Sequence, residues 1–378
     1  MSQSPLSRRR FTGALGAAVG AAVAGLPVPR PAAASLSRGE PSDLVQLNSN
    51  ENPYGPSPAA LAALTGAQAV AGRYPDADEE EVVLALARQH GVAPERVVLG
   101  CGSGDVLRMA DAAFLGPGRT VLSAEPTFEA VLGYARVTRA EPVKVPLTAD
   151  FRHDLDGMAR ACDARTGLVY VCNPNNPTGT IVPGDALVAF LARVPPAAVV
   201  LVVEAYHHFV EDPAYRSATE VLDRFPNLVV ARTFSKIYGL AGLRLGYALA
   251  SEANAGALRD HASWSNANAA VLAAALASLG DEGLVARQRA LLNGERRRLC
   301  AELDRDGRRY IPSEANFVMI EVGTDVKPLI EAFRARRILV GRRFAPMPTW
   351  LRVSVGRPEE MDAFLAALRE IVPARKAA

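Results

Sequence analysis

The chain has few cysteines and almost no excess of charge of either sign. Its four cysteines lie far apart among 378 residues and form no Cys-x-x-Cys pair, which argues against a disulfide framework or a metal site. The formal net charge is +2, so the composition does not indicate a protein that binds nucleic acid or an acidic membrane surface. About half of the residues are apolar, which is enough for one large core and a smaller second one.

Lysine is equally rare, and only one lysine has a context typical of a site. Lys144 lies in an alternating, strand-like run, Lys327 begins an amphipathic pattern, and Lys376 is in the C-terminal tail. Lys236 stands among hydroxyls, glycines and an arginine in the stretch Thr233 to Tyr247. A lysine can form a Schiff base with an aldehyde cofactor, and hydroxyls with a guanidinium can hold its phosphate. We therefore expect a cofactor lysine here rather than a solvated surface residue.

Residues 1–34 have the order of segments found in an export signal. Arg8 to Arg10 precede a weakly apolar Gly/Ala run over residues 12–26, and small residues follow at 32–34. This order resembles a twin-arginine signal peptide cleaved after Ala34, which predicts an exported, periplasmic protein. The apolar run is too short and too rich in glycine to be a stable membrane anchor. A chance basic cluster is the alternative.

Short apolar runs alternate with helical patterns through the middle of the chain. We expect strands at 96–99, 120–123, 142–146, 167–172 and 198–203, with helices at 127–137 and 154–161. This rhythm indicates a mainly parallel sheet covered on both faces, with ligands at the carboxyl ends of its strands. Helical patterns follow at 252–262, 266–279 and 282–306, and an α+β set from 315 to 372 predicts a second, smaller domain.

Two turns at predicted strand ends are suited to holding a ligand. Gly100 to Asp105 is a glycine-rich turn that leads into a helix, where free backbone N–H groups and the helix dipole favour an anion. Asn173 to Gly179 contains two prolines and three asparagines, a rigid turn that can hold an amide side chain in a fixed orientation. The first signal is weak alone, because such turns are common.

Taken in order, the motifs resemble the class I/II (fold type I) pyridoxal-phosphate aminotransferases, and the histidinol-phosphate aminotransferase branch in particular. The matching segments are Asn50 to Gly55, Arg73 to Asp76, Gly100 to Asp105, Asn173 to Gly179, Glu204 to Tyr206, Ser235 to Tyr247 and Leu351 to Gly356. The resemblance implies an α/β fold type I transferase with a mainly parallel seven-stranded sheet in its large domain. It places an N-terminal segment at 35–72, joining the small domain, the large cofactor-binding domain at 73–285, and the small α+β domain at 286–378.

The resemblance also implies roles for individual residues. Lys236 would bind pyridoxal 5'-phosphate covalently and act as the catalytic base, and the other residues on the cofactor would be Ser103, Gly104, Phe128, Asn176, Tyr206, Thr233, Ser235 and Arg244. Arg352 would clamp the carboxylate of the substrate, with Arg342, Asn52 and Tyr54 as further substrate-binding candidates. Tyr74 would reach the cofactor phosphate of a neighbouring subunit, which implies a homodimer. The substrates implied are an amino donor and a 2-oxo acid acceptor.

Several of these positions have ordinary structural explanations as well. An isolated phenylalanine such as Phe128 is usually a core residue. Tyr74 could pack in a proline-terminated turn, Asn52 and Tyr54 could belong to an ordinary proline-rich loop, and Arg342 could be a solvated surface residue.

One position departs from the family pattern. Val203 precedes Glu204 where the family has an aspartate that pairs with the pyridine nitrogen and keeps it protonated. Valine can neither accept nor donate a hydrogen bond, and a charge-assisted bond of this kind contributes about 1.5 to 3 kcal/mol. Glu204 is adjacent, but successive strand side chains point to opposite faces. We therefore expect weakened aminotransfer, or a reaction that needs less stabilisation of a carbanion.

Three alternatives remain open at the level of sequence. The first is another pyridoxal-phosphate reaction, such as decarboxylation, elimination or oxidation. The second is a catalytically impaired protein of the cell envelope that binds the cofactor or an amine, and the third is an α/β enzyme without cofactor. The sequence does not identify the amine donor.

Overall fold

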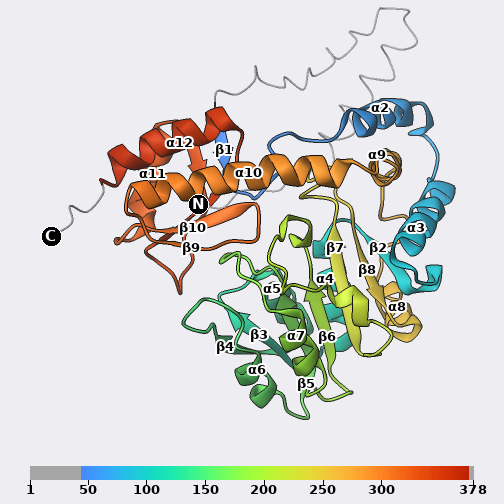
Figure 1. Cartoon of the computed structure of the whole chain (residues 1–378). Coiled ribbons are helices and arrows are strands. Elements are labelled where there is room, and N and C mark those ends of the chain that lie inside the picture. The colour runs from blue at the N-terminus through green and yellow to red at the C-terminus, as the bar shows by residue number, and fades with distance from the viewer. Residues whose placement is uncertain (1–43, 374–378) are drawn as a thin grey trace, which may run out of the picture. The chain divides into compact units, whose positions relative to one another are not determined.

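The large part of the molecule is built on one sheet. The computed structural model describes residues 44–373 (Figure 1). The sheet has seven strands in the order β2 (Val97–Gly100), β8 (Gly246–Ala250), β7 (Leu228–Thr233), β6 (Val199–Val203), β5 (Thr166–Cys172), β3 (Thr120–Glu125) and β4 (Glu141–Pro146). Only β8 runs antiparallel to its neighbours in this sheet, so the prediction of a mainly parallel seven-stranded sheet is confirmed.

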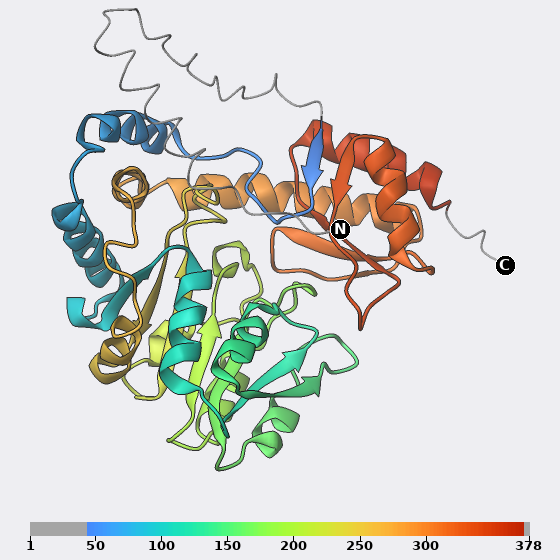
Figure 2. The same ribbon diagram turned by 180° about the vertical axis from the view of Figure 1, so that it is seen from behind.

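Helices cover both faces of this sheet, and side-chain alternation assigns each strand residue to one face. One core contains residues of α3 (Asp76–His90), α6 (Leu155–Ala161), α7 (Gly184–Leu191) and α9 (Ala269–Leu279). The other contains residues of α4 (Ser103–Phe114), α5 (Ala130–Thr138) and α8 (Glu252–Arg259), and the view from behind shows α4 over the sheet (Figure 2). Cys172 and Val203 both belong to the second core, so they lie on the face that α4 covers.

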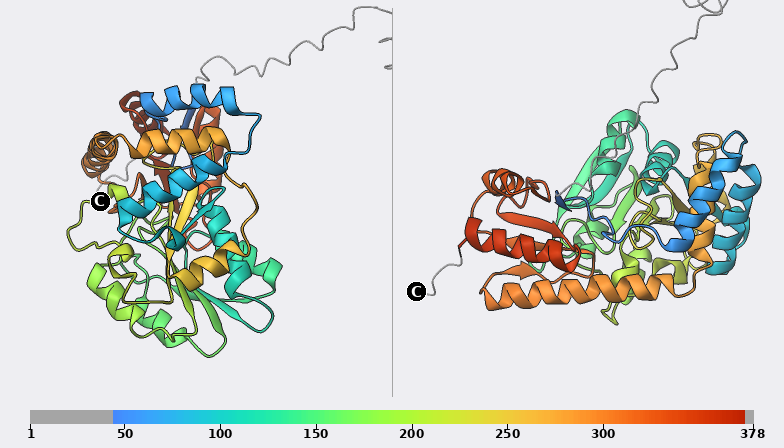
Figure 3. Two further views of the ribbon diagram at one scale, coloured as in Figure 1. Left: turned by 90° about the vertical axis from the view of Figure 1, so that its right-hand side faces the viewer. Right: turned by 90° about the horizontal axis from the view of Figure 1, so that it is seen from above.

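A second, smaller group of strands is formed from the two ends of the described chain. β1 (Val45–Leu47) pairs in parallel with β11 (Ile338–Val340), and β12 (Trp350–Ser354), β10 (Phe317–Glu321) and β9 (Tyr310–Ile311) form an antiparallel sheet. They pack with α11 (Val326–Ala335) and α12 (Pro358–Ile371). The long helix α10 (Leu284–Arg305) runs from the large sheet to this group (Figure 3).

The N-terminal segment divides between the two parts. β1 lies in the small group of strands, whereas α2 (Pro58–Ala67) packs along α9 of the large part. Four short 3-10 turns complete the described elements: η1 (Gln68–Val70), η2 (Pro94–Arg96), η3 (His207–Phe209) and η4 (Ala218–Val221). The predicted signal peptide, residues 1–34, lies outside the described residues.

Three local expectations were incomplete. Strand β8 and helix α7 were not expected, because β8 follows directly on the lysine motif and α7 is short. The helix expected from residue 127 begins at Ala130 instead. The Thr127 hydroxyl donates to Asn175 Oδ1 at 2.8 Å, which holds that residue in the preceding loop.

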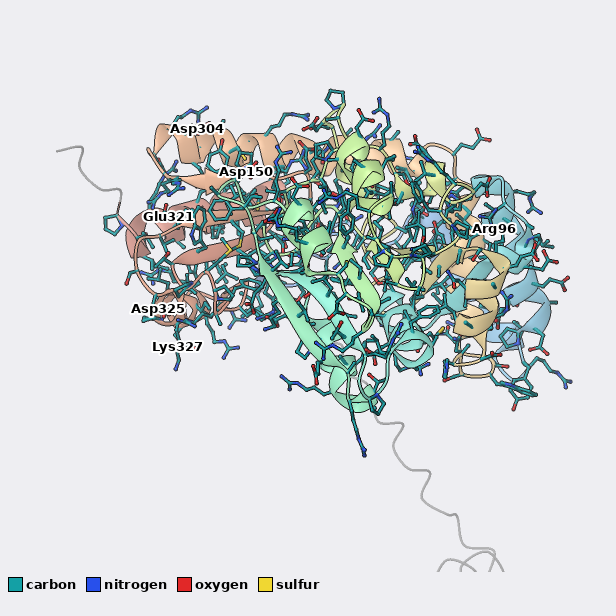
Figure 4. All side chains as sticks on the ribbon, turned by 90° about the horizontal axis from the view of Figure 1, so that it is seen from below. Arg96, Asp150, Asp304, Glu321, Asp325 and Lys327 are labelled. Carbon is teal, nitrogen blue, oxygen red and sulfur yellow. The ribbon has the colours of Figure 1, made fainter. Side chains whose placement is uncertain are left out.

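Arginine-rich surfaces carry many of the ion pairs. Arg96 lies at the surface of the large part, and Asp304, Glu321, Asp325 and Lys327 lie at the surface of the small part (Figure 4). Within residues 44–373 no single helix is long and apolar enough to cross a membrane, although α9 and α10 meet those criteria together as a pair bent by 87°.

Glu204 is held in a buried ion pair behind the sheet. Its carboxylate accepts two hydrogen bonds from the Arg232 guanidinium, at 3.0 and 2.8 Å, and also accepts from the Ser217 hydroxyl and the Ala218 backbone N–H. Both members of the pair are buried. A carboxylate so fully bonded cannot turn toward the face of Val203 without leaving Arg232 unpaired, at a cost of several kcal/mol. The prediction that Glu204 points away from Val203 is confirmed.

Candidate active site

A cavity of about 720 Å³ opens at the carboxyl ends of β5, β6 and β7 and is closed by residues of the small part. The structure brings most of the sequence-predicted residues to its wall: Ser103, Gly104, Phe128, Asn176, Tyr206, Thr233, Ser235, Lys236, Arg244, Arg342 and Arg352. This is the edge where ligands collect in parallel sheets. One carboxylate, that of Glu51, is found among the described lining residues, against five basic side chains, so the cavity favours an anionic ligand.

One end of the cavity is a cradle for a phosphate. Helix α4 begins at Ser103 without a side-chain cap, so its first N–H groups point freely at the cavity. The Thr233 hydroxyl donates to Ser235 Oγ at 2.9 Å, and Arg244 Nη1 donates to the same oxygen at 3.3 Å. Free helix N–H groups, hydroxyls and a guanidinium together are the donor set that a phosphate needs.

The cradle requires glycine beside it. Gly102 has φ of +78°, and a Cβ there would lie 2.0 Å from Arg244 Nη2. A Cβ on Gly246 would lie 2.2 Å from the Ser103 nitrogen. Both contacts are impossibly short, so only glycine lets the guanidinium and strand β8 approach the start of α4.

Lys236 projects into the same cavity. Its Nζ donates to the Ser49 carbonyl at 3.1 Å and lies 5.7 Å from the centroid of the Tyr206 ring. Burial, reinforced by the nearby Arg352 charge, lowers the pKa of Lys236 to about 8. A substantial fraction of the amine is therefore neutral near physiological pH and can attack a carbonyl. Lys144 instead pairs with Glu125 at 2.7 Å outside the cavity.

Tyr206 and Asn176 present polar groups beside the lysine. The Tyr206 hydroxyl accepts from Asn50 Nδ2 at 3.1 Å and from Asn176 Nδ2 at 3.5 Å. Burial raises the pKa of Tyr206 to about 12, so the hydroxyl keeps its proton and can donate it to a ligand oxygen. Asn50 has φ of +54° and is fixed by Ser354, whose hydroxyl donates to its Oδ1 at 3.1 Å.

Asn50 was missed at the level of sequence. It lies in the segment that was singled out, but its partner Tyr206 is 156 positions away, so only the fold reveals the contact. A positive φ at an asparagine that is not in a hairpin is the structural signal. Arg334 of α11 also lines the cavity and was not expected there.

Arg352 faces the lysine from the small part. It is 8% exposed, and its Nη1 and Nη2 donate to Asn176 Oδ1 at 2.7 Å and to the Asn48 carbonyl at 2.8 Å. Its Nε has no hydrogen-bond partner. Burial lowers the pKa of Arg352 to about 10, which still leaves the guanidinium cationic at neutral pH. A buried cation with an unused donor is suited to an anionic group of the substrate.

Three predicted residues do not line this cavity. Asn52 is buried, and its amide donates to the Ile237 carbonyl at 3.0 Å, so it braces the chain next to Lys236. The ring of Tyr54 lies against Arg357, with the guanidinium carbon 5.5 Å from its centroid. Tyr74 is 84% exposed. Arg342 does line the cavity, and its guanidinium pairs with Glu129 at 2.8 Å.

Val203 forms part of the cavity wall and is 3% exposed. The residues around it fit pyridoxal phosphate in two respects: the cradle suits the phosphate, and Lys236 suits the aldehyde. They do not supply a buried carboxylate for the ring nitrogen, because Glu204 is held behind the sheet by Arg232. The site therefore fits the cofactor but lacks the group that would keep its ring protonated.

Comparison with known proteins matches most of the described residues to one family. The sequence model described as aminotransferase class I and II matches residues 42–368. Histidinol-phosphate aminotransferase 2 of Ralstonia nicotianae is 40% identical to this chain over 343 residues, which cover 90% of this chain and 91% of that protein.

A second relative and a solved structure are similar over the same extent. The aromatic amino acid aminotransferase of Cutibacterium acnes is 38% identical over 354 residues, covering 93% of this chain and 97% of that protein. The crystal structure of histidinol-phosphate aminotransferase from Sinorhizobium meliloti, in complex with pyridoxal-5'-phosphate, is 29% identical with a TM-score of 0.82. It covers 87% of this chain and 90% of that chain.

The lowered pKa of Lys236 predicts how covalent capture of pyridoxal phosphate depends on pH. Because the neutral amine is the nucleophile, capture by the apoprotein should accelerate as pH rises, with a midpoint near 8. An unperturbed lysine would give a midpoint of about 10.4. The measurement is borohydride trapping at each pH, followed by mass spectrometry of the peptide that contains Lys236.

Two variants separate this lysine from the others. Lys236→Arg should abolish trapping, whereas Lys144→Arg, whose lysine pairs with Glu125 at the surface, should leave the midpoint unchanged. Trapping that persists in Lys236→Arg, or a midpoint above about pH 10, would contradict the assignment.

Proposed function

This chain belongs to the class I and II aminotransferase family, and from that premise we propose that it moves an amino group from an anionic amine donor to a 2-oxo acid with reduced help from the cofactor ring. The fold is that of the fold type I transferases, and pyridoxal 5'-phosphate is the cofactor. The observation that carries the proposal is the facing of Lys236 and Arg352 across a cavity with a phosphate cradle at one end.

Three side chains of the cavity have separate roles in the proposed reaction. When bound, the cofactor supplies an electron sink for the charge that develops at the donor carbon. Arg352 holds the anionic group of the donor, and its unused Nε offers a further donor. The Lys236 amine, neutral above about pH 8, would take a proton from the α-carbon of the donor and hold it for return in the next step. The Tyr206 hydroxyl, which keeps its proton, would help to hold the cofactor by donating a hydrogen bond to it.

The arginines that line the cavity indicate which amine donors it could bind. Histidinol phosphate and aromatic amino acids, the compounds in the names of the two relatives, each offer an anion that Arg352 could hold. Arg342 and Arg334 line the same wall, so a donor with a second anionic group at its far end would also be accommodated. Arg343 is turned away and pairs with Asp325 at 2.8 Å.

Val203 is the reason to propose weakened or redirected chemistry. Without a carboxylate at this position the ring nitrogen loses a charge-assisted bond of about 1.5 to 3 kcal/mol. That loss falls on the transition state, where charge flows into the ring, rather than on binding. The cradle, the lysine and Arg352 are all retained, so we expect cofactor and donor binding to be kept while the chemical step slows.

The experiment combines a panel of amine donors with substitutions at Val203. Wild-type holoenzyme should convert a suitable donor slowly, forming one oxo product per cofactor in a single half-reaction. Val203→Asp should speed that half-reaction by roughly tenfold or more with little change in KM, since it restores the charge partner of the ring. Absorbance of the cofactor during single turnovers measures both quantities.

Val203→Asn is the matched control. It has the shape of aspartate without the charge, so it should not accelerate the reaction if ring protonation is the missing element. Wild-type turnover that is already fast and not increased by Val203→Asp would contradict the proposal. Release of carbon dioxide or ammonia without stoichiometric use of an oxo acid would identify a different pyridoxal-phosphate reaction.

We also propose that the active unit is a homodimer in which Tyr74 reaches the partner's phosphate cradle. Tyr74 is 84% exposed, and Trp264, which lines a second cavity together with Asp76, is 99% exposed. Exposed aromatics of this kind are typical of interfaces.

Sedimentation should therefore give the mass of two chains for the holoenzyme. Tyr74→Phe should release the cofactor more readily, whereas Tyr310→Phe, at a hydroxyl bonded to Asp304, should not. A monomeric holoenzyme, or equal cofactor retention in both variants, would exclude this role.

The export proposal rests on residues 1–34 alone. We propose that the chain leaves the cytoplasm folded, with its cofactor bound, and is cleaved after Ala34. Cell fractionation should find a mature form that begins at Ser35, and replacing Arg8 and Arg9 by lysine should leave the precursor in the cytoplasm. A full-length chain in the cytoplasm of cells carrying the unaltered sequence would contradict export.

A further inference from the structure

We propose that the Cys172 thiol, backed by the Tyr170 hydroxyl, is the protic group that faces the cofactor's ring nitrogen, and that this nitrogen stays unprotonated during the reaction. The inference rests on the proposed function for its cofactor and its donor. The inference adds to the proposed function a hydrogen-bond partner for the ring nitrogen, which Val203 cannot provide.

The arrangement of groups around the pyridine ring determines where its nitrogen points. In pyridoxal phosphate the nitrogen is opposite the carbon that bears the aldehyde, and the phosphate arm and the hydroxyl flank that carbon on either side. Lys236 must meet the aldehyde, Ser235 and Arg244 mark the phosphate side, and Tyr206 marks the hydroxyl side. The nitrogen must therefore point away from Lys236, toward the inner wall of the cavity.

That inner wall is formed by the ends of two neighbouring strands and one helix. Cys172 is the last residue of β5, Val203 is the last of β6, and the two are register partners. Leu107 of α4 completes this part of the wall, and all three side chains belong to one core cluster. Of the three, only Cys172 can take part in a hydrogen bond.

The Cys172 thiol is protonated at neutral pH, so it can donate a hydrogen bond but does not act as a base. Burial raises the pKa of Cys172 to about 11, so the thiol carries its proton throughout the neutral range. In the structure Sγ donates to the Pro174 carbonyl at 3.3 Å. Rotation of one bond would redirect this S–H group, a weak donor, to an unprotonated pyridine nitrogen. It would not protonate that nitrogen, because it holds its own proton far more tightly than an acid would.

Tyr170 supplies the second observation. Its side chain is fully buried two residues before Cys172 on the same face of β5, and the Cys172 thiol is the one hydrogen-bonding group within reach of its hydroxyl among the described residues. A buried hydroxyl needs such a partner, because an unbonded polar group in the interior is unfavourable. When the thiol turns to the ring, its sulfur can accept from Tyr170, which satisfies the hydroxyl and polarises the S–H bond toward the nitrogen.

The consequence is a cofactor ring that attracts electrons less strongly than a protonated one. Proton transfer at the α-carbon then depends more on Lys236 and on the position of Arg352 than on the ring.

The test is nitrogen-15 NMR of the holoenzyme loaded with ring-labelled pyridoxal phosphate. Wild type should show the signal of an unprotonated, hydrogen-bonded pyridine nitrogen that does not change between about pH 6 and pH 9, since the thiol does not titrate there. Val203→Asp should move the signal to that of a protonated ring. A protonated nitrogen in the wild type would overturn the proposal.

Variants at the thiol decide its role. Cys172→Ser retains a donor and should keep the hydrogen-bonded signal, whereas Cys172→Ala should shift it toward a pyridine without a hydrogen bond. Cys162→Ala, at a half-buried thiol after α6, is the control for loss of a cysteine. An unchanged signal in Cys172→Ala would exclude the thiol as partner. Tyr170→Phe should weaken the shift without abolishing it.

The NMR result is independent of catalysis. Borohydride trapping at Lys236 and single-turnover formation of the oxo product test the proposed function separately. If no oxo product forms but the NMR signal is that of an unprotonated nitrogen bonded to the thiol, the proposed function is wrong and the assignment of Cys172 stands. If the oxo product forms but the ring nitrogen is protonated, the proposed function stands and the assignment of Cys172 is wrong.

Discussion

The alternation of side chains along β5 and β6 decides what the cofactor ring meets. Because neighbours on a strand point to opposite faces, the acidic residue that follows Val203 is committed to the back of the sheet. There it neutralises Arg232 in a pair that is buried on both sides. Moving either charge would leave the other unpaired in the interior, so the chain cannot recruit Glu204 to the ring by a small adjustment.

The same alternation of side chains places Cys172 beside Val203 on the wall of the cavity. It ends β5 where Val203 ends β6, and parallel pairing holds the two in register. Because Val203 is apolar, Cys172 is the group of this pair that can form a hydrogen bond with a bound ring. The phosphate cradle lies at the start of α4, on the same side of the sheet, so a bound ring would have its nitrogen toward this pair.

Much of the fold and many of the cavity residues could be predicted from the sequence, and the remainder could not for a physical reason. Lys236, Ser235 and Arg244 lie within one short stretch, so a single motif contains them. The mainly parallel sheet followed from the alternation of apolar runs and helical patterns. Asn50 bonds a residue 156 positions away, and the Glu204–Arg232 pair forms between adjacent strands, so neither contact leaves a local pattern.

Val203 changes the balance of charge in the cavity as well as the chemistry of the ring. With no aspartate there, the described wall has one carboxylate against five cations, which strengthens its field for anionic ligands. We therefore expect phosphate and substrate carboxylate to be held at least as firmly as in a site with that aspartate, and the step that needs the ring to draw electrons to be slower. On our proposal, tight binding and modest turnover would both follow from the valine at this one position, and we expect Val203→Asp to leave KM unchanged and to alter kcat.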